Sequence, residues 1–328
     1  MVLALKDKWI WDFWLVDAKD APDGLWHAYF LQADNTLLNP EMRHRNVTQG
    51  HATSKELVNW NYHGTCFAPS KGPAFDDWTT WTGSVVQGPD ATWHLFYTGT
   101  QHAGEGLHQR IGHATSQDMH SWVRVGDGLC LDLTGPNAKY YEEYTPPHWP
   151  DRAMRDPWVM KNPDGEGWIM YFTARVPGRI EPNAGGAIGF ATSPDLMQWD
   201  LQKPVYDGGA FGQLEVPQVF KYGNNWYMAF CTQAQHWAES YCKDNPQKPL
   251  NGNHYLIADS HLGPWTAPRP FLDGWPTWHR YAGKIVTLDG KLNLLTSLFD
   301  DKNGRFVGQV NDPLPLRVDA HGHLHLET

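Results

Sequence analysis

Three acidic residues stand in unusually apolar surroundings: Asp12 in WIWDFW, Asp156 in MRDPWV and Glu215 in LEVPQV. Each lies near the start of a short strand-like segment. An unpaired carboxylate is costly to bury, so each acid alone is explained either by a structural role, such as capping a turn or pairing with an arginine, or by chemistry. Carboxyls that crowd around one pocket raise each other's pKa, which can place a protonated acid beside an ionised carboxylate. Together the three acids therefore indicate a catalytic pocket.

The elements that would position these acids form an internal repeat. A short aromatic strand occurs five times, and turn signals such as PDG, GPD and YGN precede its copies, at 24–32, 91–99, 166–174, 224–232 and 291–299. A second strand, a Ser-containing turn and a Trp follow, clearly in three copies, weakly in a fourth and in degenerate form in a fifth, at 49–60, 111–122, 188–199, 254–265 and 306–316. Another short strand precedes each aromatic strand.

A single module of this kind has unprotected edges and half a core, so the modules must stack on one another. A β-sandwich also repeats short strands, but it does not predict five copies of one strand–turn–Trp signature. We therefore predict an all-β, five-bladed β-propeller that forms one domain over residues 1–328. Because the first strand of each blade lines the central channel, we expect Asp12, Asp156 and Glu215 to converge on one axial pocket.

Composition narrows the class of partner. The 328 residues carry a formal net charge of -10, which argues against a nucleic-acid partner. Eighteen Trp and 13% aromatic residues suit the apolar faces of sugar rings, although aromatic side chains also fill the cores between sheets. We expect a small saccharide as the partner, and the oligomeric state stays open.

Metal, cofactor and membrane signals are weak. The four cysteines show no C-x-x-C spacing, and the 17 histidines are scattered. His51 and His113 recur at equivalent repeat positions, which favours a structural role. We therefore expect no metal and no cofactor. The N-terminus lacks a signal-peptide pattern and no segment resembles a membrane span, so a cytoplasmic location is expected.

The acidic segments resemble those of a known superfamily. The retaining fructosidases of glycoside hydrolase families 32 and 68, and the related families 43 and 62, are five-bladed propellers with an acidic triad. The fructosidase signatures are an Asp near the N-terminus, an Arg-Asp-Pro and a Glu in a Glu-Cys-Pro-like stretch. This chain has Asp12, Arg155-Asp156-Pro157 and Glu215-Val216-Pro217. Its Trp81-Thr82-Gly83-Ser84 is similar to the Phe-Ser-Gly-Ser segment of the family.

The resemblance implies a role for each acid. Asp12 would be the nucleophile, Glu215 the general acid/base, and Asp156 would hold sugar hydroxyls with Arg155 beside it. The implied activity is retaining hydrolysis of a small furanoside, foremost a terminal β-D-fructofuranosyl unit as in sucrose or fructo-oligosaccharides, with transfructosylation as a related reaction. The alternatives are an inverting α-L-arabinofuranosidase of the family 43 type and a sugar-binding propeller without catalysis. The presence of all three acids argues against the last of these.

Two departures from family 32 bear on substrate and domain organisation. The first Asp usually lies in Asn-Asp-Pro-Asn-Gly, whereas here Trp11 and Phe13 flank it, which weighs against sucrose itself. Family 32 enzymes also usually carry a C-terminal β-sandwich, whereas this chain ends with the fifth blade, so we expect a catalytic propeller alone.

Further pocket residues follow from their proximity to these motifs. We expect substrate contacts from Arg155, Trp11, Trp14, Trp81, Ser84, Trp158 and His279. The segment 37–46 carries Arg43, His44 and Arg45; it is interpreted as a loop over the pocket, a subunit contact or a solvated charged loop. The segment 140–152 leads into Arg155 and is expected to form a rim of the pocket.

Overall fold

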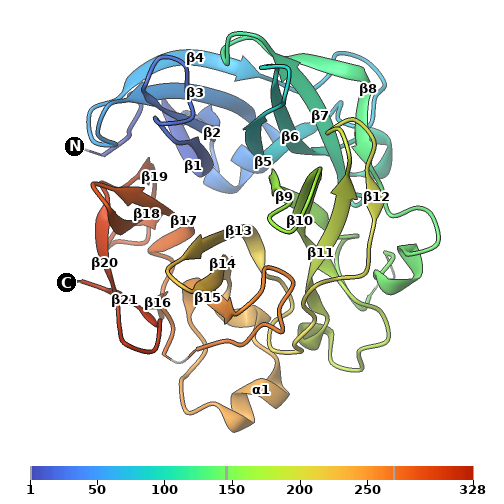
Figure 1. Ribbon diagram of the computed structural model, residues 1–328, viewed down its shortest axis with the longest axis vertical. Coiled ribbons are helices and arrows are strands. Elements are labelled where there is room, and N and C mark those ends of the chain that lie inside the picture. Colours follow the sequence, from blue (N-terminus) through green and yellow to red (C-terminus); the bar gives the residue numbers. More distant parts are fainter. Residues whose placement is uncertain (1, 145–146, 269, 328) are drawn as a thin grey trace.

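The computed structural model describes residues 2–144, 147–268 and 270–327. Five antiparallel sheets stand around a central channel, with the first strand of each sheet innermost (Figure 1). The predicted five-bladed β-propeller is confirmed, and no β-sandwich lies among the described residues. No helix in these residues is long and apolar enough to span a bilayer.

The first two blades each have four consecutive strands. Blade 1 contains β1 (Lys8–Val16), β2 (Trp26–Asp34), β3 (Thr48–Ser54) and β4 (Asn61–Phe67). Blade 2 contains β5 (Thr79–Gln87), β6 (Trp93–Thr100), β7 (Arg110–Ser116) and β8 (Val123–Leu131).

The next two blades repeat this order. Blade 3 contains β9 (Met154–Lys161), β10 (Trp168–Arg175), β11 (Gly186–Ser193) and β12 (Asp200–Leu201). Blade 4 contains β13 (Glu215–Tyr222), β14 (Asn225–Thr232), β15 (Asn251–Ala258) and β16 (Asp273–Trp275).

The fifth blade differs by an additional strand, β19, which pairs with β18 off the main path of the sheet. Blade 5 contains β17 (Arg280–Leu288), β18 (Lys291–Asp300), β19 (Phe306–Val310), β20 (Leu314–Val318) and β21 (Leu324–Leu326). The short helices in the connections are η1 (Pro40–Arg45), η2 (His102–Gly104), η3 (Ala138–Tyr140), η4 (Pro182–Ala184), η5 (Ala234–His236) and α1 (Glu239–Asp244).

The second strand of each blade forms the core between blades. Every residue of β6 and of β10 is buried, so both faces of these strands are covered and no polar face alternates with an apolar one. Buried tyrosines link one blade to the next. The hydroxyl of Tyr29 donates to the carbonyl of Met119 (2.8 Å), and that of Tyr171 donates to the carbonyl of His261 (3.0 Å). The predicted aromatic repeats therefore serve mainly as packing between sheets.

The ring is closed between the first and last parts of the chain. The amide of Leu3 donates to the carbonyl of Val310 (2.9 Å), and the amide of Val310 donates back to the carbonyl of Leu3 (3.0 Å). Figure 1 shows the two chain ends on the same side of the ring, next to blade 5. This pairing joins the segment before blade 1 to β19 of blade 5.

All five innermost strands contain a bulge at the same point. The register against the second strand shifts once in each, within 11–13, 81–83, 155–158, 215–218 and 281–284. A bulge adds an unpaired residue and re-aims the neighbouring side chains. Three of the bulged residues, Asp156, Val216 and Ala282, have left-handed backbone with φ of 57°, 54° and 49°. For a β-branched residue such as Val216 this backbone is strained by roughly 1–3 kcal/mol.

The bulges define two rings of residues around the channel. The outer ring holds the residue just before each bulge: Trp11, Trp81, Arg155, Glu215 and Tyr281. The inner ring holds the first bulged residue: Asp12, Thr82, Asp156, Val216 and Ala282. Asp12 and Asp156 thus occupy equivalent positions, whereas Glu215 aligns with Arg155, one residue earlier. The three acids therefore do not all occupy equivalent positions of their blades, since Glu215 is offset by that one residue.

Candidate active site

One end of the channel opens into a cavity of about 870 Å³. It lies at the N-terminal ends of the innermost strands, and all five outer-ring residues line it. Four inner-ring residues line it as well: Asp12, Thr82, Asp156 and Val216. The structure therefore brings the three predicted acids into one cavity large enough for a small saccharide.

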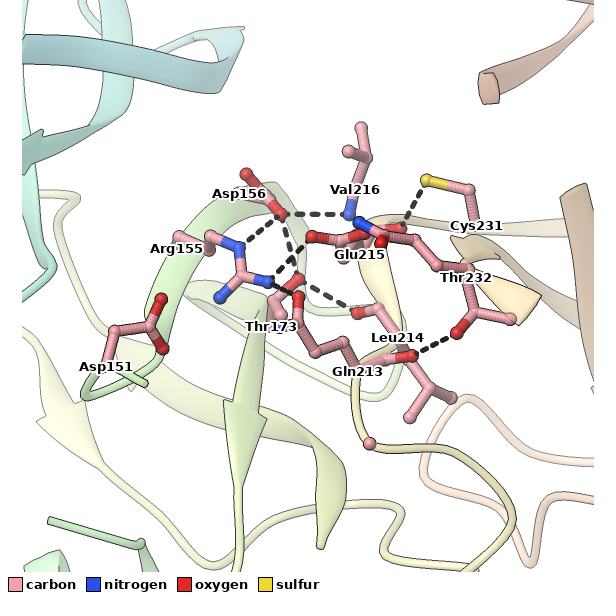
Figure 2. Close-up of polar contacts among 12 residues, drawn as sticks. Asp151, Arg155, Asp156, Thr173, Gln213, Leu214, Glu215, Val216, Cys231 and Thr232 are labelled. Atoms are coloured by element: carbon pink, nitrogen blue, oxygen red, sulfur yellow. Dashed lines mark hydrogen bonds and ion pairs between the residues drawn. The ribbon is translucent and has the colours of Figure 1, made fainter. Parts of the chain in front are cut away.

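Arg155 lies between two of these acids (Figure 2). Its Nη2 is 2.8 Å from Glu215 Oε1, and its Nε is 3.6 Å from Asp156 Oδ2. Two glutamine side chains complete the surroundings of the guanidinium: Gln109 Oε1 accepts from Nη1 at 3.1 Å, and Gln213 Oε1 accepts from Nη2. Because the side chain is almost fully buried and its partners hold both ends of the guanidinium, Arg155 fixes the relative positions of the two carboxylates.

Backbone and hydroxyl groups hold Asp156. Its Oδ2 accepts from the amide of Val216 (3.0 Å) and from the Thr173 hydroxyl (3.0 Å), while its own amide donates to Thr98 Oγ1 (2.8 Å). Burial raises the pKa of Asp156 above its usual value, and the charge of Arg155 offsets part of that rise. The strained backbone at Val216 thus has a visible effect, since it directs an amide at this carboxylate.

Cationic and hydroxyl partners keep Glu215 ionised. Burial alone would raise the pKa of Glu215, but Arg155, His236 and a hydrogen bond from the Tyr281 hydroxyl together lower it below its usual value. This carboxylate carries a full negative charge in the cavity.

Asp12 has the weakest support of the three acids. Among the described residues, its side chain accepts one hydrogen bond, from the Thr82 hydroxyl, 3.1 Å from Oδ2. Burial, followed by the charges of Asp156 and Glu215, raises the pKa of Asp12 to about 7. Near neutral pH the Asp12 carboxyl of the free protein is therefore divided between its protonated and ionised forms.

The segment 37–46 forms one wall of the cavity. Its 3-10 helix η1 begins at an Asn39 cap, and Arg43, His44 and Arg45 all line the cavity. The indole of Trp81 donates to the carbonyl of His44 (2.9 Å), which ties this segment to the outer ring. Of the three interpretations given above, the structure supports a loop over the pocket.

The remaining predicted contact residues are divided. Trp11 and Trp81 line the cavity, but Trp14, Ser84, Trp158 and His279 do not. Trp14 is fully buried and stacks near Tyr29, and Ser84 Oγ accepts from the amide of Val159 (3.1 Å). Trp158 lines a second cavity at the opposite end of the channel, because each residue advances about 3.3 Å along a strand.

The predictions for His279 and for the segment 140–152 also differ from the structure. His279 packs edge-on against Trp275, and its neighbour Trp278 lines the cavity instead. Of the segment 140–152, Asp151 lines the cavity, so this segment contributes one side chain to the rim. Residues 145–146 of that segment lie outside the described residues.

Among the cavity residues that were not predicted as contacts, four side chains bind the acids or Arg155: Thr82, Gln109, Gln213 and Tyr281. Thr82 lies within the quoted Trp81-Thr82-Gly83-Ser84 segment, and Gln213 directly precedes the LEVPQV segment, so both could have been found near the motifs. Gln109 and Tyr281 lie in segments without any acidic motif. Only the folded ring shows that they contact Arg155 and Glu215.

Comparison with known proteins finds a family match over most of the chain. The model of the glycosyl hydrolases family 32 N-terminal domain matches residues 21–264. Over 256 residues the chain is 27% identical to an invertase of Wickerhamomyces anomalus, covering 73% of this chain and 40% of the invertase. It is 31% identical over 179 residues to a sucrose-6-phosphate hydrolase of Bacillus subtilis, covering 52% of this chain and 32% of that enzyme. The chain thus spans less than half the length of these relatives.

Solved structures show the same fold. An inulosucrase from Halalkalicoccus jeotgali bound to kestose superposes with a TM-score of 0.77 at 20% identity, over 98% of this chain and 87% of that one. The β-fructofuranosidase catalytic domain of Microbacterium saccharophilum gives a TM-score of 0.72 at 16% identity, over 100% and 82%. At these identities the similarity establishes the propeller architecture, while the family assignment follows from the sequence match, which extends over most of the chain. The chain belongs to glycosyl hydrolase family 32.

Proposed function

We propose that this propeller is a retaining glycosidase that releases terminal β-D-fructofuranosyl units from short, uncharged saccharides. The observation that carries the proposal is the division of the acids between the two rings. Asp12 and Asp156 lie in the inner ring, and Glu215 lies one residue closer to the mouth. A terminal sugar in the inner ring would direct its glycosidic oxygen toward Glu215 and its leaving group toward the mouth.

Each acid then has a distinct task. Asp12 attacks the anomeric carbon, Glu215 donates a proton to the departing oxygen, and the resulting glycosyl–Asp12 ester is hydrolysed by water that Glu215 deprotonates. Asp156 is held by Val216 and Arg155, so it suits hydrogen bonding to sugar hydroxyls rather than attack. Asp12 has the fewest restraining contacts, which suits a group that must form and break a bond.

The proton has to change place before the first step. In the free protein Asp12, whose pKa is raised to about 7, holds a proton in part of the molecules near neutral pH, whereas the reaction needs the proton on Glu215. A sugar hydroxyl that donates to Asp12, and a glycosidic oxygen that accepts from Glu215, would favour the required arrangement. Only one proton is needed, and Asp12 carries it in most molecules at pH values below about 7.

The charges around the cavity favour a neutral substrate. Among the described residues, six carboxyl groups line it, those of Asp12, Glu41, Asp151, Asp156, Glu215 and Asp300. Three guanidinium groups oppose them, those of Arg43, Arg45 and Arg155, and two of these already face Glu41 and Glu215. A phosphorylated sugar would add negative charge to a site with an excess of it.

The test is a comparison of substrates by NMR. The protein is incubated separately with sucrose, a fructo-oligosaccharide mixture, sucrose 6-phosphate and 4-nitrophenyl α-L-arabinofuranoside. We expect fructose to be released first as the β-furanose, with the neutral substrates ahead of the phosphorylated one. Arabinose released with inverted configuration would replace the proposal by an inverting pentosidase. Binding of a saccharide without turnover of any substrate would leave a sugar-binding module.

A further inference from the structure

Three of the histidines that are scattered along the sequence meet at the outer side of blade 1. His51 lies on β3, His63 on β4, and His120 in the turn between β7 and β8 of blade 2. One nitrogen from each ring lies within 4.8 Å of the other two. None of the three lines the catalytic cavity. His51 is fully buried, while the other two are exposed.

A chain of hydrogen bonds behind His51 sets its tautomer. His27 Nε2 is 3.1 Å from Asp23 Oδ1, and His27 Nδ1 is 2.9 Å from His51 Nε2. A carboxylate only accepts, so Nε2 of a neutral His27 carries the proton and its Nδ1 has the lone pair. His51 must then donate through Nε2, and its lone pair lies on Nδ1.

That lone pair has no partner. His51 Nδ1 is buried and makes no hydrogen bond within the described part of the chain. A buried polar atom without a partner is costly and requires an explanation. The rings of His63 and His120 lie beside it, with centroids 5.0 and 4.7 Å from that of His51. These neighbours are the most common type of metal ligand.

We propose that His51, His63 and His120 bind a divalent transition-metal ion of the zinc type, with solvent in the fourth position. Neutral imidazole nitrogens suit Zn²⁺ at bonds of about 2.0–2.1 Å. Tetrahedral geometry at that bond length separates ligand atoms by roughly 3.3 Å, so the rings must close in from 4.8 Å. His63 and His120 are exposed, so a small shift of their rings can bring them toward buried His51, which provides a fixed anchor.

The contacts outside the three rings match those of known metal sites. Metal-bound histidines usually donate their second N–H to a carboxylate or another acceptor. His51 does so through His27 to Asp23, and His63 Nε2 lies 2.8 Å from the Thr53 hydroxyl. Because His120 comes from blade 2, the ion would join two blades and act as a structural clip.

Blade 2 offers an internal comparison. His94 and His113 form the same stacked pair, with Nδ1 2.8 Å from Nε2. By strand register and turn spacing, the positions that correspond to His63 and His120 are Val125 and Met197. The histidine pair is therefore a structural repeat, as its recurrence predicted, whereas the two additional rings are specific to the interface between blades 1 and 2.

The experiment uses the full chain after treatment with EDTA. Titration with Co²⁺, followed by the visible absorption of tetrahedral cobalt, and titration with Zn²⁺ by calorimetry should each give one ion per chain. His63→Ala and His120→Ala alter exposed side chains, so both variants should fold, and each should weaken binding by at least about 100-fold, since loss of a partner outside the ligands alone costs 10–100-fold. Zn²⁺ should raise the melting temperature of the unchanged chain but not of His120→Ala.

His323→Ala is the matched control. This partly exposed histidine lies near Asp319 together with His325, a second place where a metal could associate. The control should bind one ion as tightly as the unchanged chain. Absence of stoichiometric binding, or binding that His63→Ala and His120→Ala leave intact, would overturn the proposal.

Discussion

The outer and inner rings are built by the same backbone device yet differ in how tightly their charged groups are held. In the outer ring, Arg155, Glu215 and Tyr281 form a connected set of ion pairs and hydrogen bonds. In the inner ring, Asp156 is held by Val216 and Thr173, but Asp12 has Thr82 as its hydrogen-bond donor. The bulge thus places a side chain in the cavity, and the contacts of that side chain then determine what it can do.

The largest effect should come from the loosely held acid of the inner ring. Asp12→Asn keeps the shape of the residue and removes the nucleophile, so kcat on a fructosyl substrate should fall on the order of 10⁴-fold or more. Steady-state kinetics with the best substrate found by NMR measure this. Residual activity within tenfold would mean that the inner ring does not carry the attack.

Replacement of the outer-ring acid should depend on the leaving group. Glu215→Gln removes the proton donor, which contributes about 10²–10⁴-fold when the leaving group is a sugar alkoxide. With β-D-fructofuranosyl fluoride the first step needs little protonation, so its rate should be nearly retained. Single-turnover rates on both substrates separate the two cases. An equal loss on both would remove the assigned difference between the rings.

The inner ring should also be a source of instability. Because the pKa of Asp12 rises from 3.8 to about 7 on folding, the folded chain retains a proton that the unfolded chain loses as pH rises between these values. Stability therefore falls across that window, by up to about 4 kcal/mol above pH 7. Asp12→Asn lacks this loss and should be more stable than the unchanged chain at pH 8 but not at pH 3.5. Urea denaturation at both pH values tests this difference, and a stability gain that does not vary with pH would contradict it.

The smallest effect concerns Thr82, a neutral residue of the inner ring. In the unchanged chain, kcat/KM should fall as pH rises above about 7, when the triad loses its proton. The Thr82 hydroxyl favours ionised Asp12, so Thr82→Val should raise the pKa of Asp12 further. The fall in kcat/KM should then begin about one pH unit higher. Ser84→Ala, two residues along β5 and outside the cavity, is the control and should leave the pH dependence of kcat/KM unchanged.

The sequence predicts the ring and the three acids because both recur with the blades. Repeated aromatic strands and turns indicate five modules, and the acids stand out against apolar neighbours. The exact placement of side chains could not be predicted, because one inserted residue changes which side chains face the cavity. Trp14 and Trp158 were expected in the pocket because they are close to the acids in sequence, whereas Trp14 is fully buried in the core and Trp158 lines the cavity at the other end of the channel. Likewise, Gln109 and Tyr281 become visible only when distant strands are brought together.

The pairing of Leu3 with Val310 also has a consequence for how the chain is made. Leu3 and Val310, which pair to close the ring, are synthesised more than 300 residues apart. Blades 1 to 4 are therefore made before the ring can close. Until β19 is made, the backbone at Leu3, before blade 1, lacks its partner and can pair with another unpaired strand. Conditions that slow translation near the fifth blade should therefore favour association between nascent chains. A domain-swapped dimer, in which Leu3 of one chain pairs with Val310 of the other, would keep every blade intact.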